Sequence, residues 1–350
     1  MMNGCDSEME SGNKAGDVWD VAAQLLKPIL HGVFKMPPTR LLSHYKLDAK
    51  KDRLLTVSCS AEDMLLPRSN FIFSGAMTAV CGITPMITAL SVNPNKVTSQ
   101  IYLLPRFPKE NGDRDWRVPV EAPSQLWLLH VGNAYQNLDQ DGNLEMQIQA
   151  CACSYQWFNF HKLFGYDWQT GKLDPSIMNI ISEGQKGLPH LIQVSIRLDA
   201  NGVCQKCKVE PLNQWDKSSD FPVINPAFSG RKNTYIYAAA SSGSRPALPH
   251  FPFDMVAKLN VSNKLVRTWS VGSRRFVGEP IFIPNGAEED DGYPLAVEFQ
   301  YAVSVQRCYL VILDPKRIGE ADHALVARLE VPKHLNFPLG FHGFWRAADK

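Results

Sequence analysis

Three of the nine histidines stand in sequence settings that could support metal binding. His130 interrupts the apolar run 126–131, and a neutral imidazole in such a strand needs a hydrogen-bond partner or a metal ion. We expect that strand to be buried on both faces. His342 has glycines on both sides and aromatic residues around it, so the backbone can bring its ring close to another group. His44 stands near the start of a predicted strand.

Two carboxylates stand in comparably apolar surroundings. Glu279 is the one acid in the predicted strand 278–284, and Asp220 precedes the run 221–225. A buried acid is costly without a cation or an imidazole beside it, so each should have such a partner. The acidic run Glu289–Asp291 is interpreted instead as a solvated turn.

The histidines also permit a simpler interpretation. Each, taken alone, is more often a core residue hydrogen-bonded to a carbonyl than a ligand. No His-x-x-x-His or HExxH motif marks a local metal site. The residues by themselves therefore leave the protein an all-β chain of open function.

Several other function classes lack support. No GxSxG, P-loop or GxGxxG motif follows a predicted strand. The net charge of +1 and the absence of a Lys/Arg stripe make nucleic acid a poor partner. The one CxxC pair, Cys204 and Cys207, lacks the second pair of a zinc ribbon. No apolar stretch of about 20 residues predicts a membrane span, and the acidic first 17 residues, which contain no arginine, resemble neither a signal nor a transit peptide.

The elements that must position these residues are mostly strands. A helix is predicted at about 17–35, capped by Asp17, which could pack on a core or touch a membrane surface. Beyond it, β-branched and aromatic residues predict strands at 126–135, 144–153, 191–198, 235–240, 265–271, 295–305 and 309–313, separated by Asp-Gly and Asn-Gly turns.

A weak internal repeat favours a β-propeller. The pair Leu-Asp or Leu-Asn occurs at 47–48, 198–199, 259–260 and, more loosely, 313–314. Each pair ends an apolar strand and is followed by a polar turn and then another strand. The irregular intervals suit a propeller with unequal loops. A β-sandwich remains the competing architecture.

The last third of the chain resembles carotenoid cleavage oxygenases. The resemblance rests on the segments Gly278–Pro284, Glu289–Tyr293, Cys308–Asp314, Ala327–Leu329 and Pro338–Gly343. Three further segments resemble the plant subgroup that cleaves the 9,10 double bond and feeds strigolactone synthesis: Trp116–Val120, Phe221–Asn225 and Leu335–Gly343.

This resemblance implies a fold and a site. The family is a seven-bladed β-propeller with Fe²⁺ on its axis, held by four histidines. Matched to this sequence, His44 is the first ligand, His130 the third and His342 the fourth, and the carboxylates that orient the imidazoles are Asp220 and Glu279.

The resemblance also implies an activity. The family's non-haem iron dioxygenases cleave a carotenoid with O₂, here at the 9,10 (9′,10′) double bond, to an apocarotenal and a ketone in the plastid. An apolar tunnel would select the bond by depth and bend, because a carotene has no polar handle. No protein partner is predicted.

The sequence departs from the family pattern at one ligand. No histidine lies between His44 and His130, as though about a blade's length were absent near Ser74, and the N-terminal blades are absent too. We therefore predict one incomplete propeller domain over residues 1–350. Two alternatives stay open: a catalytically inactive carotenoid-binding fragment, and a generic interaction propeller with unrelated histidines.

Overall fold

The computed structural model of the chain describes part of its length. The described residues are 40–48, 53–59, 97–103, 114–115, 118–125, 127–154, 166–167, 172–173, 179, 187–215, 217–301, 306–335, 337 and 342–345. The chain forms two compact units, 1–92 and 93–350, which are described separately below. The predicted helix at about 17–35 and the segment near Ser74 lie outside the described residues, and the prediction of a single domain stays a prediction.

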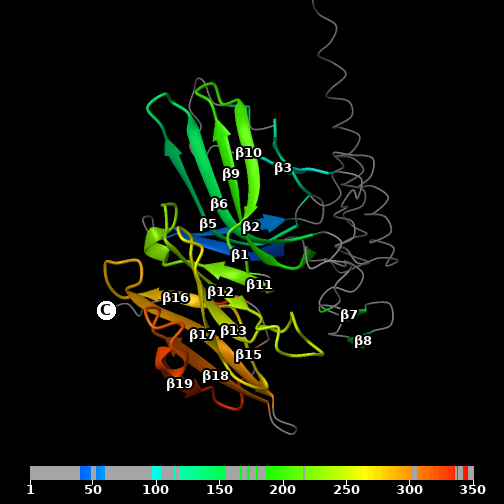
Figure 1. Cartoon of the computed structure of the whole chain (residues 1–350), viewed down its shortest axis with the longest axis vertical. Helices are drawn as coiled ribbons and strands as arrows, with labels where there is room; N and C mark the ends of the chain where they lie inside the picture. The colour runs from blue at the N-terminus through cyan, green and yellow to red at the C-terminus, as the bar shows by residue number, and fades with distance from the viewer. Residues whose placement is uncertain are drawn as a thin grey trace, which may run out of the picture. The chain divides into compact units, whose positions relative to one another are not determined.

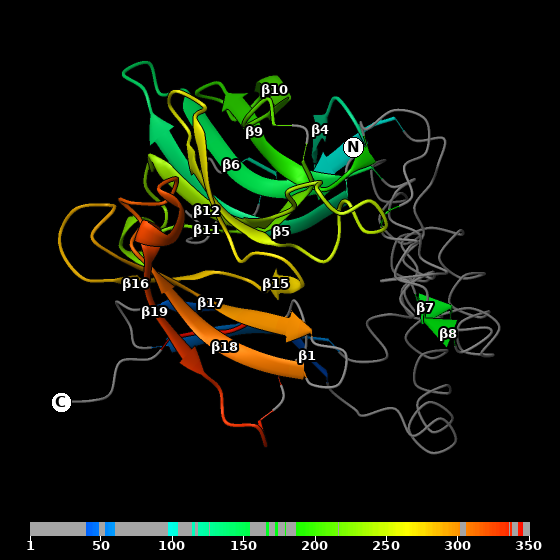
Figure 2. The same cartoon turned by 60° about the horizontal axis from the view of Figure 1, so that its bottom comes forward.

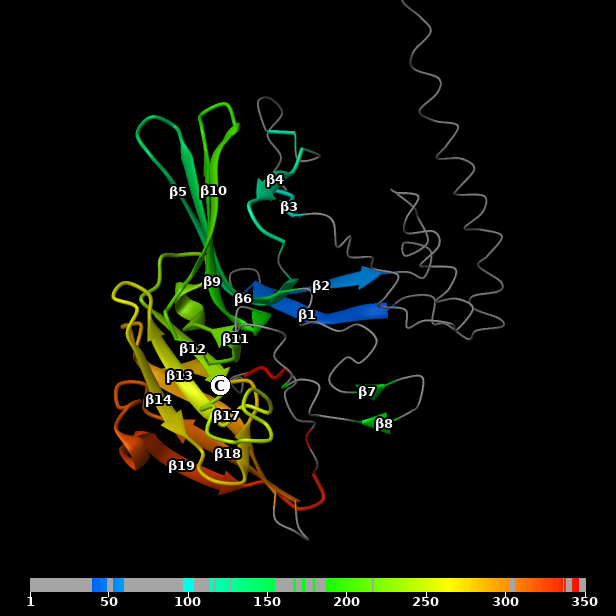
Figure 3. The ribbon, with the colours of Figure 1, turned by 45° about the vertical axis from the view of Figure 1, so that its right-hand side comes forward.

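The described residues of the first unit form an antiparallel hairpin. Strand β1 (Arg40–Asp48) pairs with β2 (Arg53–Cys59), and both are drawn in blue in Figure 3. The pairing slips between Leu41 and Tyr45, so His44 lies within the irregular part of the ladder, and the pairing is regular from Tyr45 onward. The backbone position of His44 is thus within a strand, as expected, but its side chain lies outside the described residues.

The described residues of the second unit form three larger antiparallel sheets, which succeed one another along the chain (Figure 1), and two two-stranded ones, β3-β4 and β7-β8. The first sheet contains β5 (Trp127–Leu138), β6 (Leu144–Cys153), β9 (His190–Leu198) and β10 (Cys204–Pro211). The second contains β11 (Ser219–Val223), β12 (Tyr235–Ala240), β13 (Met255–Asn260) and β14 (Val266–Ser270).

The third sheet begins with an interrupted strand. Two short strands, β15 (Arg275–Val277) and β16 (Ile281–Pro284), both pair with β17 (Gly292–Tyr301), which is followed by β18 (Gln306–Leu313) and β19 (Leu325–Glu330). Figure 2 shows β17 and β18 side by side. The smaller elements are β3 (Ser99–Ile101), β4 (Val120–Ala122), β7 (Tyr166–Asp167), β8 (Lys172–Leu173) and the 3₁₀ helices η6 (Pro226–Phe228) and η7 (Ala321–Ala324).

The repeated Leu-Asp pattern has a physical basis in the turns. Asp199 ends β9, and its Oδ1 accepts hydrogen bonds from the backbone N–H groups of Asn201 and Val203, each at 2.9 Å. Asn260 does the same after β13, at 3.0 and 3.2 Å. Such side-chain caps close a tight turn without help from the rest of the fold. Asp139 after β5 forms a further copy of this turn, which the internal repeat in the sequence did not include.

The core lies between adjacent sheets. One apolar cluster joins the second and third sheets and includes Tyr237, Trp269 and Val311. Another joins the first and second and includes Leu191 and Ile236. The first strand of the second sheet, β11, contacts β5, β6 and β9.

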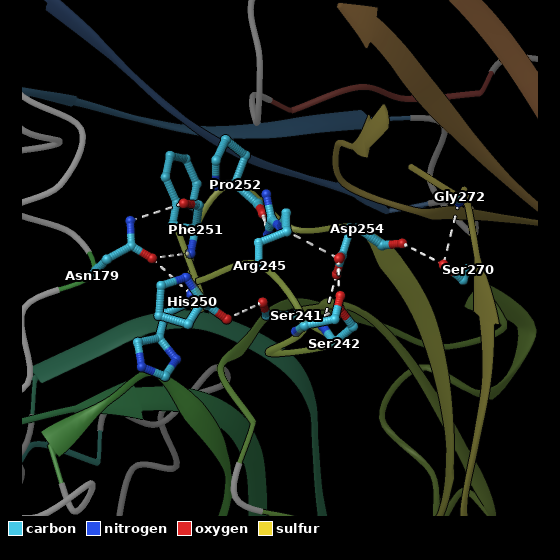
Figure 4. Close-up of polar contacts among 12 residues, drawn as sticks. Asn179, Ser241, Ser242, Arg245, His250, Phe251, Pro252, Asp254, Ser270 and Gly272 are labelled. Atoms are coloured by element: carbon cyan, nitrogen blue, oxygen red, sulfur yellow. Dashed lines mark hydrogen bonds and ion pairs between the residues drawn. The ribbon is translucent and has the colours of Figure 1, made fainter. Parts of the chain in front are cut away.

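A long loop, residues 241–254, connects β12 to β13 and is fixed by polar contacts. The amide oxygen of Asn179 accepts the backbone N–H groups of His250 and Phe251, at 2.7 and 2.9 Å (Figure 4). Asp254 accepts from the Ser242 hydroxyl at 2.7 Å and pairs with Arg245 at 3.4 Å. Phe251 contacts Phe253, with ring centroids 5.7 Å apart, so the anchored loop also positions an aromatic pair.

The predicted fold class and all seven predicted strands are confirmed, and the ends differ from the predicted ones in all but β6 and β12. The expectation that the strand around His130 is buried on both faces is wrong. Leu128 and Val131 are 44% and 47% exposed, because β5 is at the edge of its sheet, where, among the strands that the structure describes, it pairs with β6 alone. Among the described residues, no helix has the length and apolar character needed to span a membrane.

Candidate metal centre

His130 on β5 is held by a carboxylate from the next sheet. Its Nδ1 lies 2.8 Å from Oδ1 of Asp220 on β11, and the two side chains are 21% and 10% exposed. A carboxylate bonded to Nδ1 favours the tautomer with its proton there, so that Nε2 is the nitrogen able to coordinate a metal. The expectation that Asp220 has an imidazole partner is confirmed.

His342 is held in the same way by a different sheet. Its Nδ1 lies 3.2 and 3.3 Å from the two carboxylate oxygens of Glu279, and the backbone N–H of Gly343 donates to the second oxygen at 3.1 Å. Glu279 is in the gap between β15 and β16 rather than inside one strand as predicted. The interruption frees this residue from the ladder and lets its side chain reach the C-terminal segment.

The two imidazoles meet. Their ring centroids are 5.0 Å apart with an interplanar angle of 72°, although the residues are more than 200 positions apart in the chain. By contrast, Nδ1 of His190 lies 2.8 Å from the carbonyl oxygen of Leu188, which is the simple core arrangement weighed above. Carboxylate partners and mutual contact distinguish His130 and His342 from that arrangement.

Irregular strands place the site residues. The β5–β6 register shifts on both sides of His130, between Leu128 and His130 and between Val131 and Asn133. The β11–β12 register shifts immediately after Asp220. Bulges of this kind turn a side chain out of the normal alternation and are frequent beside active sites. His44 stands within a comparable irregularity of β1, which is a backbone similarity between the three positions.

A glycine permits the close approach of β5 to β11. A Cβ built on Gly132 would lie 3.0 Å from Cβ and 3.3 Å from the carbonyl oxygen of Pro222. Pro222 is two residues after Asp220, so this contact sets the separation of the strands that carry His130 and its carboxylate. Any larger residue at position 132 would push them apart.

Two cysteines beside Asp220 are poor ligands. Burial raises the pKa of the Cys151 thiol well above its usual value, and the charge of Asp220 raises it further. Burial and Asp220 also raise the pKa of Cys153. Both thiols therefore stay protonated at neutral pH, and the Cys151 thiol donates to the carbonyl of Ser219 at 3.1 Å.

The imidazoles of His130 and His342 have the chemistry expected of two ligands of one metal ion. Carboxylate–imidazole pairs are the usual outer support of metal-binding histidines, and neutral imidazoles suit divalent iron. Within the described part of the chain, no group of three His, Cys, Asp or Glu side chains is close enough to hold an ion. The structure thus brings together four of the five predicted site residues, and the His44 side chain lies outside its description.

Sequence reasoning missed two features. Phe221, whose ring centroid is 4.6 Å from that of His130, was considered only as part of a motif. The acidic turn Glu289–Asp291 is not a solvated turn. Glu289 accepts the backbone N–H groups of Thr234 and Tyr235, and Asp290 is 14% exposed, because both carboxylates face the second sheet.

Asp290 forms a buried polar cluster there. Its Oδ1 accepts the Tyr237 hydroxyl at 2.5 Å and its Oδ2 pairs with Lys258 at 2.5 Å. Burial and the bond to Asp290 raise the pKa of Tyr237 far above its usual value, so the phenol stays protonated. This cluster joins the second and third sheets.

The chain is similar to proteins of one family. Residues 63–347 match the family described as "RPE65: Retinal pigment epithelial membrane protein". The chain is 55% identical to "Carotenoid cleavage dioxygenase 7, chloroplastic" of Arabidopsis thaliana over 99% of its own length and 65% of the relative's. It is 48% identical to the protein of the same name in Oryza sativa subsp. japonica, over 93% of the chain and 60% of the relative. The chain thus spans less than two thirds of either relative.

The Arabidopsis alignment contains an internal difference in length. It extends over 403 positions, whereas 99% of the 350 residues of this chain is about 347. About 56 positions therefore hold residues of the relative opposite gaps in this chain. The relative contains residues within the aligned region that this chain lacks.

Solved structures support the fold. Cobalt-substituted Synechocystis ACO aligns with a TM-score of 0.53 and 18% identity, over 87% of this chain and 58% of that chain. The trigonal crystal form of a D477G ACO/RPE65 chimera aligns with a TM-score of 0.53 and 20% identity, over 76% and 48%. These matches support the predicted propeller fold, in which each four-stranded sheet is a blade.

Proposed function

The chain belongs to the RPE65, or carotenoid oxygenase, family, and on that premise we propose that it is a dioxygenase chain that cleaves a carotenoid with O₂. The observation that supports this proposal most directly is the contact between two imidazoles, His130 and His342, each anchored by a carboxylate from a different sheet. The identity of 55% with a carotenoid cleavage dioxygenase supports the substrate class.

The finer proposal concerns the bond and the compartment. A relative from Pisum sativum, 28% identical over 71% of this chain, is named a carotenoid 9,10(9′,10′)-cleavage dioxygenase. We infer cleavage of that bond, to an apocarotenal and a ketone, as a step toward strigolactones. The two most similar relatives reported above are both named chloroplastic, which supports a plastid location.

Fe²⁺ is the proposed metal, with His44, His130 and His342 as ligands and Asp220 and Glu279 as the orienting carboxylates. Support for His44 is the irregular pairing of β1, which matches the irregularities at His130 and Asp220. Bound Fe²⁺ would supply the electronic chemistry that lets O₂ react with a double bond.

The chain's own side chains would do the positioning. Asp220 and Glu279 hold the Nδ1 protons, so that both imidazoles present Nε2 in a fixed direction. A carotene offers no polar group to bind, so apolar walls must place its double bond. Buried Phe221, whose ring lies next to both imidazoles, is apolar surface of the required kind.

Product analysis tests the activity. The purified chain is supplied with Fe²⁺ and incubated with cis and trans carotenes under ¹⁸O₂, and both carbonyl products are analysed by mass spectrometry. We expect one labelled oxygen in each product and no product from His130→Ala or His342→Ala. Unchanged turnover in either variant would overturn the assignment of the site.

A second candidate function is binding without cleavage. The aligned positions of the Arabidopsis relative that this chain lacks favour it, because an incomplete set of ligands would bind iron weakly. In that case the polyene absorption band shifts on binding, iron is substoichiometric, and no product forms. Stoichiometric iron together with turnover would exclude it.

A further inference from the structure

Phe221 has a backbone conformation that bulky residues rarely adopt. Its φ angle is 57°, in the left-handed region, where the side chain is crowded by its own backbone. The residue lies in β11 within the register shift between Asp220 and Val223. A local strain of this kind persists only where surrounding contacts compensate for it.

The backbone of Phe221 contacts the carboxylate that holds His130. Its N–H donates to Oδ1 of Asp220 at 2.7 Å, and the same oxygen lies 2.8 Å from Nδ1 of His130. The Phe221 N–H thus contributes a second hydrogen bond to the oxygen that orients the imidazole. This bond limits the rotation of the carboxylate.

The ring of Phe221 contacts both imidazoles. Its centroid is 4.6 Å from that of His130, at an angle of 35°, and 6.1 Å from that of His342, at 80°. Its other neighbour is Phe253 in the core of the second sheet, at 6.2 Å and 90°. The Phe221 side chain is buried, with 8% of the residue exposed. It therefore lies between the packed core and the imidazole pair.

We propose that Phe221 is a positioning residue for the metal centre, fixing both the Asp220 carboxylate and the relative orientation of His130 and His342. A hydrogen bond at Nδ1 fixes one direction of an imidazole ring but restricts rotation about that direction less. A rigid ring packed against its face removes this freedom. That these imidazoles form a metal centre rests on the proposed function, whereas the effect of Phe221 on the orientation of the rings does not.

The competing explanation is core packing alone, since Phe221 shares an apolar cluster with Phe253. Phe253 is the matched control. It is buried to a similar degree, with 5% exposed, and among the contacts of the described residues it has aromatic neighbours but no imidazole. A packing role predicts the same consequences for Phe221→Leu and Phe253→Leu.

The first measurement uses the metal-free chain. Imidazole ¹⁵N chemical shifts report which ring nitrogen is protonated, and His130→Ala and His342→Ala assign the signals. We expect the Nδ1–H tautomer at both residues in the parent chain and in Phe253→Leu. In Phe221→Leu we expect averaging between the two tautomers. Unchanged tautomers in Phe221→Leu would overturn the proposal whether or not the chain binds metal.

The second measurement is titration with Co²⁺, followed by its visible absorption. We expect Phe221→Leu to weaken binding by about 10-fold and shift the band, and Phe253→Leu to change neither. Equal effects of the two variants would contradict a positioning role. If the parent chain binds no Co²⁺, or His130→Ala does not weaken binding, the proposed metal centre fails separately.

Replacing Phe221 by two smaller residues separates the effect of backbone strain from that of the ring contacts. Phe221→Ala and Phe221→Gly both remove the ring, but only glycine adopts a φ of 57° without strain. We expect Phe221→Gly to have a higher melting temperature than Phe221→Ala, with the same weakening of Co²⁺ binding. A glycine variant that restored binding would show that the ring does not orient the imidazoles.

Discussion

Two single residues, Gly132 and Lys258, act through the contacts that they allow between neighbouring strands and sheets. Gly132 has no side chain, and for that reason β5 approaches Pro222 closely enough for His130 to reach Asp220. Lys258 is a buried cation on a strand of the second sheet, and its Nζ donates to Asp290 and to the carbonyl of Pro315, in loops that adjoin strands of the third sheet. Neither role can be recognised from the residue type alone.

Gly132→Ala tests the close approach. The added Cβ would lie 3.0 Å from Cβ of Pro222, so β5 and β11 must separate slightly. We expect a loss of about 1–3 kcal/mol in the free energy of unfolding, as for an overpacked core, and a longer His130–Asp220 bond. Gly343→Ala is the control, since a Cβ there meets nothing within 4 Å. Equal melting temperatures for the two variants would contradict this account.

Lys258→Met tests the buried ion pair. The change removes the cation beside Asp290, whose side chain is only 14% exposed, and leaves the Tyr237 hydroxyl bonded to its Oδ1. We expect a loss of about 3–5 kcal/mol in urea unfolding. Lys316→Met removes the partner of the next carboxylate, Asp291, at 2.8 Å, but that lysine is 59% exposed. The control should therefore cost less than about 1 kcal/mol.

Elements follow the sequence closely where local chemistry decides them. Strands β6 and β12 were predicted to the residue. The Asp141-Gly142 turn marks the start of β6, and β12 is a continuous apolar run that is buried almost throughout. Glu289 and Asp290 were misassigned, because their partners, Thr234 just before β12 and Lys258 in β13, are far away in the sequence. The interruption at Glu279 was also missed, since pairing of β15 and β16 with one strand depends on β17.

The hairpin turns should make stability depend on pH. Hydrogen bonds from Asn143 lower the pKa of Asp139, and those from Val203 and Asn201 lower that of Asp199. A folded-state pKa below the unfolded value stabilises the protein at higher pH. That stability is lost as the pH falls through the folded-state pKa.

Asparagine at both positions would remove this dependence while keeping the turn, because Asn260 already caps the equivalent turn after β13. We expect the double variant Asp139→Asn, Asp199→Asn to lose less melting temperature than the parent between neutral pH and about pH 2. The check is a series of thermal melts against pH. Parallel curves for the two proteins would refute the role of these carboxylates.

At the scale of the whole second unit, the site joins elements that are otherwise separate. His130 comes from the first sheet, Asp220 from the second, Glu279 from the third, and His342 from the segment after β19. The sequence indicated each of these residues through the family resemblance, but their convergence depends on the packing of three sheets. No local pattern specifies that packing.

This arrangement predicts that metal binding stabilises the unit as a whole. An ion that binds only the folded state raises the free energy of unfolding, by about 2.7 kcal/mol at 100 times its dissociation constant. His130 and His342 lie near opposite ends of the unit's sequence, so an ion bound by both connects its first and last segments. We therefore expect Co²⁺ to raise the melting temperature measured by probes in all three sheets. His190→Ala, a change in a carbonyl-bonded histidine, should preserve the rise, whereas His130→Ala and His342→Ala should each abolish it. A rise confined to one sheet, or one that survives in His342→Ala, would mean that the two imidazoles do not hold a common ion.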